Sequence, residues 1–204
     1  MLTLTQKHII PIAAFTAIGN IEKLKTALNQ SLDAGLTINE AKEVLVQAYA
    51  YAGFPRSING LVALMDVVKQ RQALSKHDVV GKDVTPLHDD RTMLAIGTEI
   101  QTKLVGQPLT GPLYDFAPAI DQFLKSHLFG DIFVRDILDY PTREVATIAI
   151  LATLNGAEAQ LSAHYQIGRN SGLSTQDLHE IVDILHQAVS AEIGNHAEQV
   201  LQKL

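Results

Sequence analysis

The chain has 204 residues, 47% of them hydrophobic and 19% charged, which suits one large domain or two small ones with an apolar core. It contains no cysteine, which excludes thiol nucleophiles, disulfides, cysteine-ligated metal sites and CxxC redox pairs. The net charge of −6, without any run of basic residues, argues against nucleic acid and anionic membranes as partners.

The first apolar stretch follows Lys7 and ends near Phe15, an outline that a secretory signal would share. An internal repeat favours a core helix instead, because a shift of 137 positions aligns this stretch with residues 145–154 in one ungapped register. We therefore expect two helical copies in a cytoplasmic protein. No apolar run approaches the ~20 residues that a bilayer requires. The matched pairs include Thr5 with Thr142, Thr16 with Thr153, Gly19 with Gly156, Leu24 with Leu161, Gly35 with Gly172, Glu43 with Glu180, and Leu64 with Leu201.

Each copy contains a helix junction, at residues 35–40 and 172–177. A glycine suited to a left-handed helix end precedes Thr37 or Ser174, which lies three positions before a carboxylate, as in a capping box. Beyond each cap, apolar residues recur at helical spacing. No segment shows the alternation of a strand, so we expect an all-α fold. The apolar residues are Ala41, Val44, Leu45, Ala48 and Ala52 in the first copy, and Leu178, Ile181, Val182, Leu185 and Val189 in the second.

The two copies are separated by a polar segment, residues 75–90, that has the composition of a linker. Two helices are predicted after it, over Arg91–Leu104 and Asp115–Leu128, with glycines and prolines between them. The chain therefore divides into a first, degenerate helical copy (1–74), a linker (75–90) and a second, longer helical copy (91–204).

Several motifs resemble the carboxymuconolactone decarboxylase family, and together they cover nearly the whole chain. The resemblance implies a small all-helical fold that assembles into rings, so we expect a homo-oligomer, a trimer or a hexamer. The motifs are Gly97–Gln101 with Leu104 and Gly106, Phe129–Arg135, Leu138–Glu144, Leu161–His164 with Gly172–Ser174, and Glu43–Pro55 in the first copy.

The family resemblance implies two different chemistries. One branch decarboxylates a carboxylated muconolactone without a cofactor, and the other is an alkylhydroperoxidase-type disulfide reductase with a CxxC before the motif histidine. Here the two cysteine positions hold Ala157 and Gln160, so thiol peroxidase chemistry is excluded. The remaining interpretation is a cofactor-free carbon–carbon lyase acting on a small carboxylated lactone or related organic acid. The alternative is a non-catalytic oligomeric module that binds a small molecule or serves assembly.

Loss of carbon dioxide from a carbon conjugated to a lactone carbonyl leaves a dienolate. The site must hold the carboxylate, stabilise charge on the lactone oxygen and return a proton to carbon. The candidate catalytic residues are His164 and Glu144, and the candidate substrate-binding residues are Arg143, Arg56, Tyr51, Gly53 and Pro55.

Each polar candidate also has a structural interpretation. Glu144 lies in the first turn of an apolar helix, where a carboxylate favours the helix dipole. His164 falls on an inward face, where it could be a hydrogen-bonded core histidine. Arg143 could be a solvated partner of Asp139 or Asp136.

A second polar set, His179, Asp183 and His186, lies along one predicted helix face. Such spacing can chelate a metal, but its ends lie ~10.5 Å apart along the helix axis. We therefore expect a polar flank or a subunit contact there, and no metal site.

The two copies divide the candidate residues between them. The first copy has Lys7 and Ala27 at the positions that Glu144 and His164 occupy in the second. Conversely, the second copy lacks the Gly53 and Pro55 of the first. We therefore expect a composite pocket that combines Glu144 and His164 with the turn 51–56, within one chain or across a subunit boundary.

Overall fold

A computed structural model describes all 204 residues, and it contains helices but no strand. The expected all-α fold is confirmed. The elements of the first part of the chain are α1 (Leu4–Ile18), α2 (Ile21–Asp33), α3 (Ile38–Ala52) and α4 (Phe54–Ala73). Those of the second part are α5 (Met93–Val105), α6 (Pro112–Phe116), α7 (Pro118–Gln122), the π-helix η1 (Phe123–Ile132), α8 (Tyr140–Leu151), α9 (Glu158–Ser171), α10 (Thr175–Ile184), the π-helix η2 (Leu185–Val189) and α11 (Ala191–Leu201).

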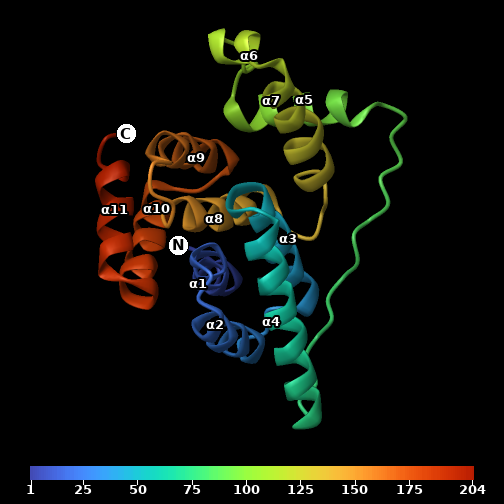
Figure 1. Cartoon of the computed structure of the whole chain (residues 1–204), viewed down its shortest axis with the longest axis vertical. Coiled ribbons are helices and arrows are strands. Elements are labelled where there is room, and N and C mark those ends of the chain that lie inside the picture. The colour runs from blue at the N-terminus through green and yellow to red at the C-terminus, as the bar shows by residue number, and fades with distance from the viewer.

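Helices α1 and α8 pack against each other at the centre of the molecule (Figure 1). Their N-terminal ends meet where Gln6 Nε2 donates to Thr142 Oγ1 over 3.2 Å. In addition, α8 packs on α3, while α1 packs on α10 and η2. Helices α1 and α8 thus each contact helices of the other predicted copy, and a core of 40 buried residues draws on both copies.

Both predicted helix junctions are confirmed. The Thr37 side chain accepts from the Glu40 backbone N–H, and the Glu40 carboxylate accepts from the Thr37 N–H. Ser174 and Asp177 form the same capping box. The preceding glycine is left-handed in each case, with φ of 95° at Gly35 and 117° at Gly172. Local sequence is therefore sufficient to set these two turns.

The predicted helix over Asp115–Leu128 is wrong. The structure places two helices of five residues there, α6 and α7, followed by the first part of η1. Between α6 and α7, Ala117 has φ −130° and ψ 71°, which is outside the helical region. Pro118 explains the break, because a proline ring disfavours helical geometry in the residue before it. The helix predicted over Arg91–Leu104 is present as α5, which begins after the Thr92 cap.

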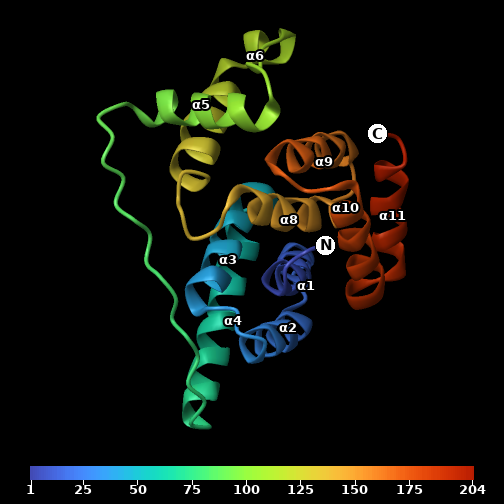
Figure 2. The same ribbon diagram turned by 180° about the vertical axis from the view of Figure 1, so that it is seen from behind.

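Helices α5 to α7 and η1 form a lobe that projects from the central layer and has its own small core of eight buried residues (Figures 1 and 2). Gly97 lies so close to η1 that a Cβ there would fall 1.7 Å from the Lys125 carbonyl oxygen. Ile167 of α9 belongs to the same core, which fixes the lobe to the second copy.

The segment between α4 and α5 has no regular structure and runs along the outside of the molecule (Figures 1 and 2). It is nevertheless held in place. The backbone N–H groups of Ile38 and Asn39 donate to the carbonyls of Val79 and Val80, and the Asp136 carboxylate accepts from the backbone and hydroxyl of Thr85. The segment therefore fixes the loop that precedes α8. None of the helices combines the length and apolar character that crossing a bilayer would need.

Candidate active site

Glu144 and His164, which are 20 positions apart, meet in the interior. His164 Nδ1 lies 2.7 Å from Glu144 Oε2, and the two side chains are 11% and 0% exposed. They come from α8 and α9, which pack closely because Gly168 of α9 has only a hydrogen facing Ile148 and the Glu144 Cβ. His164 Nε2 makes no hydrogen bond within the chain.

Tyr51, from the end of α3, lies beside this pair. Its ring centroid is 5.7 Å from that of His164, and the planes meet at 83°. The hydroxyl oxygen is enclosed and has no hydrogen-bond partner. A residue of the first copy thus contacts the histidine of the second within a single chain.

Arg143 is fully buried, which overturns its interpretation as a solvated partner of Asp139 or Asp136. Its terminal nitrogens donate to Glu43 Oε1 over 2.7 Å and to Gln47 Oε1 over 2.8 Å. Gln47 in turn donates to the Arg143 carbonyl over 2.9 Å. Nε is the one guanidinium nitrogen of Arg143 without a partner. Because Nη2 also donates to the Arg135 carbonyl over 2.7 Å, both of its hydrogens are engaged, and a ligand carboxylate cannot clamp Nε and Nη2 together without breaking a contact.

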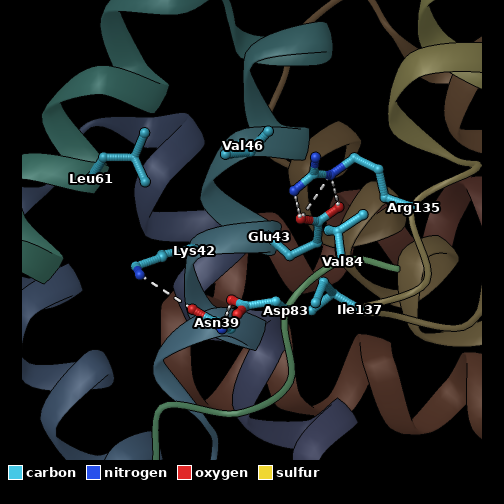
Figure 3. Close-up of a pocket in the computed structure, with 9 residues that line it drawn as sticks. All are labelled: Asn39, Lys42, Glu43, Val46, Leu61, Asp83, Val84, Arg135 and Ile137. Atoms are coloured by element: carbon cyan, nitrogen blue, oxygen red, sulfur yellow. Dashed lines mark hydrogen bonds and ion pairs between the residues drawn. The ribbon is translucent and has the colours of Figure 1, made fainter. Parts of the chain in front are cut away.

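Glu43 connects this buried network to the surface. Besides Arg143, its carboxylate accepts from Arg135, whose Nε is 2.9 Å from Oε1 and whose terminal nitrogen is 2.9 Å from Oε2. Figure 3 shows the two side chains facing each other at the edge of a cavity of about 210 Å³, with Val84 and Ile137 beside them. Lys42 points away from them, toward Asn39. Glu43 thus separates this cavity from Arg143.

The environment shifts the pKa values of these groups in directions that their contacts explain. Burial acts to raise the pKa of Glu43, but hydrogen bonds from Arg135 and Arg143 outweigh it, so the pKa is lowered. Burial lowers the pKa of Arg143, and Glu43 counteracts that effect. Burial also raises the pKa of Tyr51, and the charge of Glu144 raises it further. Glu43 therefore stays ionised and Tyr51 stays protonated near neutral pH.

Three enclosed polar atoms around the dyad have no partner in the chain. They are the Tyr51 hydroxyl, the Arg143 Nε and the Glu144 Oε1. Buried polar groups are nearly always paired, and one that is not costs about 1–3 kcal/mol. Two donors and an acceptor on these neighbouring residues are thus open for hydrogen bonds. His164 and Glu144 line none of the five main cavities.

The other predicted site residues lie in the turn after Tyr51. Gly53 joins α3 to α4 with φ 84° and ψ 159°, a conformation that favours glycine. Pro55 is the second residue of α4 and is exposed. Arg56 is exposed as well, and its guanidinium donates to the Ile18 carbonyl at the end of α1 over 2.6 Å. Arg56 has no hydrogen bond to the dyad or to Arg143.

Sequence reasoning missed Glu43, Gln47 and Arg135 as members of the network. Glu43 and Gln47 are four residues apart on α3, beside its apolar face, and both are buried. A pair of polar residues at that spacing next to an apolar stripe is a usable signal, because burial there demands a partner. Their partner Arg143 lies 100 positions away from Glu43 and could not be identified from spacing.

The second polar set does not converge. His179 Nδ1 lies 3.6 Å from Glu198 Oε2 on α11. The Cβ of His186 packs close to Gly194. No group of three or more His, Cys, Asp or Glu side chains in the structure is placed to hold a metal ion.

Comparison with known proteins gives two matches. The model of the carboxymuconolactone decarboxylase family matches residues 1–66 and 118–203, two segments consistent with a tandem helical repeat. A protein of Acinetobacter baylyi (strain ATCC 33305 / BD413 / ADP1) named 4-carboxymuconolactone decarboxylase is 30% identical over 99 residues. That alignment covers 47% of this chain and 72% of the relative.

Proposed function

Because this chain belongs to the carboxymuconolactone decarboxylase family, we propose that it is a cofactor-free carbon–carbon lyase that removes carbon dioxide from a small carboxylated lactone or a related organic acid. The observation that carries the proposal is the enclosed contact between Glu144 and His164 beside unpaired polar atoms. Open polar atoms beside a buried dyad are the groups that a bound polar ligand would satisfy.

His164 supplies the proton in this proposal. Its Nε2 is free, and the bond from Nδ1 to Glu144 orients the ring and stabilises the imidazolium. When the carbon–carbon bond to the carboxylate breaks, its electron pair enters the conjugated lactone as a dienolate. Nε2 then returns a proton to carbon, and solvent reprotonates the imidazole. General acid catalysis of this kind typically contributes about 10²–10⁴-fold to a rate.

Arg143 orients the substrate carboxylate through its Nε–H. Because its terminal nitrogens are held by Glu43 and Gln47, the guanidinium is fixed in position before a ligand arrives. A single N–H contact holds the carboxylate weakly, which suits a group that must leave as neutral carbon dioxide. Tyr51 forms one wall of the same site.

The composite site is proposed to lie within one chain. The edge-to-face contact of Tyr51 with His164 supports it, since the two residues belong to different copies. Gly53 and Pro55 shape the turn that ends α3 and thereby set where Tyr51 lies. At the position of the first copy that matches Glu144, the chain has Lys7, whose ammonium pairs with Glu180 over 2.6 Å.

We propose in addition that the chain forms a homo-oligomer, a trimer or a hexamer. The support is an apolar stripe along α4 in which Phe54, Ile58, Val62 and Met65 are 62%, 53%, 47% and 64% exposed. Large side chains at this spacing lie on one helix face and favour burial against a partner. Size measurement by light scattering tests this, and a monomer at micromolar concentration would contradict it.

The proposed activity is tested by incubating the purified protein with 4-carboxymuconolactone and with a panel of β-keto and vinylogous acids, and following carbon dioxide release. We expect release from the carboxylated lactone in proportion to enzyme. Release from none of the compounds, by protein that is folded by circular dichroism, would contradict a lyase. Binding of these acids without release would support a module that only binds small molecules.

A further inference from the structure

The Tyr51 hydroxyl is enclosed yet has no hydrogen-bond partner. The Thr147 hydroxyl is close enough to act on that of Tyr51, but no hydrogen bond of normal geometry joins the two, and the Thr147 oxygen accepts from Gln47 Nε2 over 2.9 Å. The other enclosed tyrosine gives a comparison, because the Tyr165 hydroxyl donates to the Ala197 carbonyl over 3.1 Å. An enclosed phenol that donates to nothing in its own chain is therefore a feature of this site and not of the fold in general.

The surroundings of Tyr51 indicate what its hydroxyl would meet. The charges of Glu144 and Arg143 both act on it, and the His164 ring lies edge-on 5.7 Å away. A group bound among these residues would contact the Tyr51 hydroxyl at one point and the dyad at another. That is the arrangement that a small planar acid with two separate oxygen functions requires.

We propose that the Tyr51 hydroxyl donates a hydrogen bond to the lactone carbonyl oxygen of the substrate and stabilises the negative charge that decarboxylation places there. This inference rests on the proposed function and assigns the oxyanion partner that the proposed function leaves open. Tyr51, a residue of the first copy, would then take part in the chemistry as well as form a wall of the site.

The step balances without a co-reactant. The bond between the ring carbon and the carboxylate carbon breaks, carbon dioxide leaves, and the electron pair passes through the conjugated system to the lactone oxygen. Tyr51 keeps its proton and only donates a hydrogen bond. The proton that ends on carbon comes from His164, so the net change is one substrate carboxylate and one proton converted to carbon dioxide and the uncarboxylated lactone.

Tyr51 is suited to remain a donor throughout. Its burial raises the pKa of the phenol, and the nearby Glu144 charge raises it further. The group is therefore protonated at any pH where the protein would work. Thr147 is the one competing acceptor that acts on it, and because no hydrogen bond of normal geometry joins the two hydroxyls, little has to break before Tyr51 reaches a ligand.

The test compares Tyr51→Phe with Tyr49→Phe, the same substitution two residues earlier on α3. The Tyr49 ring stacks on Phe54 at 4.3 Å, outside the site. With 4-carboxymuconolactone, we expect Tyr51→Phe to lower kcat about 10²-fold, as loss of one oxyanion donor does, and to raise KM about 5-fold through loss of the hydrogen bond to the ground-state carbonyl. Tyr49→Phe should match wild type. Equal kcat for wild type and Tyr51→Phe would overturn the inference and leave the proposed function standing.

A binding measurement separates the two proposals if wild type shows no turnover. The saturated probe tetrahydro-5-oxofuran-2-carboxylate carries a lactone carbonyl and a carboxylate but cannot form the dienolate. We expect it to bind wild type and Tyr49→Phe alike, and Tyr51→Phe at least 5-fold more weakly, a loss in the range of one hydrogen bond. Equal affinity for all three proteins, or no binding to any, would overturn the role of Tyr51.

Discussion

The Glu43 carboxylate accepts hydrogen bonds from Arg143 inside the protein and from Arg135 at its surface. Arg143 and Glu144 are consecutive residues of α8, so the network that holds the arginine also fixes the start of the helix that carries the dyad. The region around the Glu144–His164 dyad is thus held by an ion pair between a helix of the first copy and a helix of the second.

Replacing Glu43 should be costly to stability. Glu43→Gln leaves the buried Arg143 without its counter-charge, and removing one partner of a buried pair costs about 3–5 kcal/mol. The register-matched control is Glu180→Gln, because Glu180 accepts from Lys7 in a half-exposed pair worth about 0–1 kcal/mol. Urea denaturation gives both free energies of unfolding. Similar losses of unfolding free energy for the two variants would show that burial of the Glu43 network does not determine its contribution to stability.

Lowering the pH should destabilise the protein partly through Glu43. The pKa of Glu43 is lowered from its ordinary value of 4.5 in the folded state, so its stabilisation is present above pH 4.5 and is lost as the pH falls through the folded pKa. Below pH 4.5, the free energy of unfolding of Glu43→Gln should fall less steeply than that of wild type. The difference in slope is at most about 1.4 kcal/mol per pH unit. Parallel curves would contradict this assignment.

Gly19 and Arg56 form a second structural pair that can be tested. A Cβ at Gly19 would lie 1.3 Å from Arg56 Nη1, so Gly19→Ala must displace the guanidinium from the Ile18 carbonyl. Gly35→Ala is the control, since it has a similar positive φ but nothing within 4 Å. We expect about 1 kcal/mol of destabilisation from left-handed strain in each variant, and about 1 kcal/mol more in Gly19→Ala. Equal losses in denaturation would show that Arg56 does not stabilise the end of α1.

The apolar stripe of α4 predicts where subunits meet. Val62→Lys places a charge in the middle of the stripe and should reduce the mass of the assembly measured by light scattering, because burying an unpaired ammonium is unfavourable. Gln70→Lys adds the same charge on the same helix outside the stripe and should leave the mass unchanged. An unchanged mass for Val62→Lys would place the interface elsewhere.

The sequence predicted the features that depend on neighbouring residues. The capping boxes at Thr37 and Ser174 form as expected because each needs only four consecutive positions. The dyad was predicted from a family motif, and the structure brings its two members into contact. The broken helix after Asp115 could have been anticipated, because Pro118 restricts Ala117 and the stretch lacks a cap.

The long-range contacts of the site could not be predicted in this way. Arg143 reads as a surface residue because Asp139 and Asp136 are near it in sequence, whereas its actual partner Glu43 comes from another helix. The open Tyr51 hydroxyl depends on which polar groups surround it in the folded chain, and spacing in the sequence does not give those neighbours. Such properties arise from packing between the copies, which composition and spacing do not encode.

The proposed role of the Glu144–His164 dyad is tested most directly by the rate of carbon dioxide release from 4-carboxymuconolactone by wild type, His164→Asn and His179→Asn, measured side by side. His179 is an exposed histidine paired with Glu198 and serves as the matched control. We predict release by wild type and His179→Asn at the same rate, and a rate at least about 10²-fold lower for His164→Asn with unchanged helicity. Equal rates for His164→Asn and wild type, or no release by wild type, would contradict the assignment of the dyad to decarboxylation.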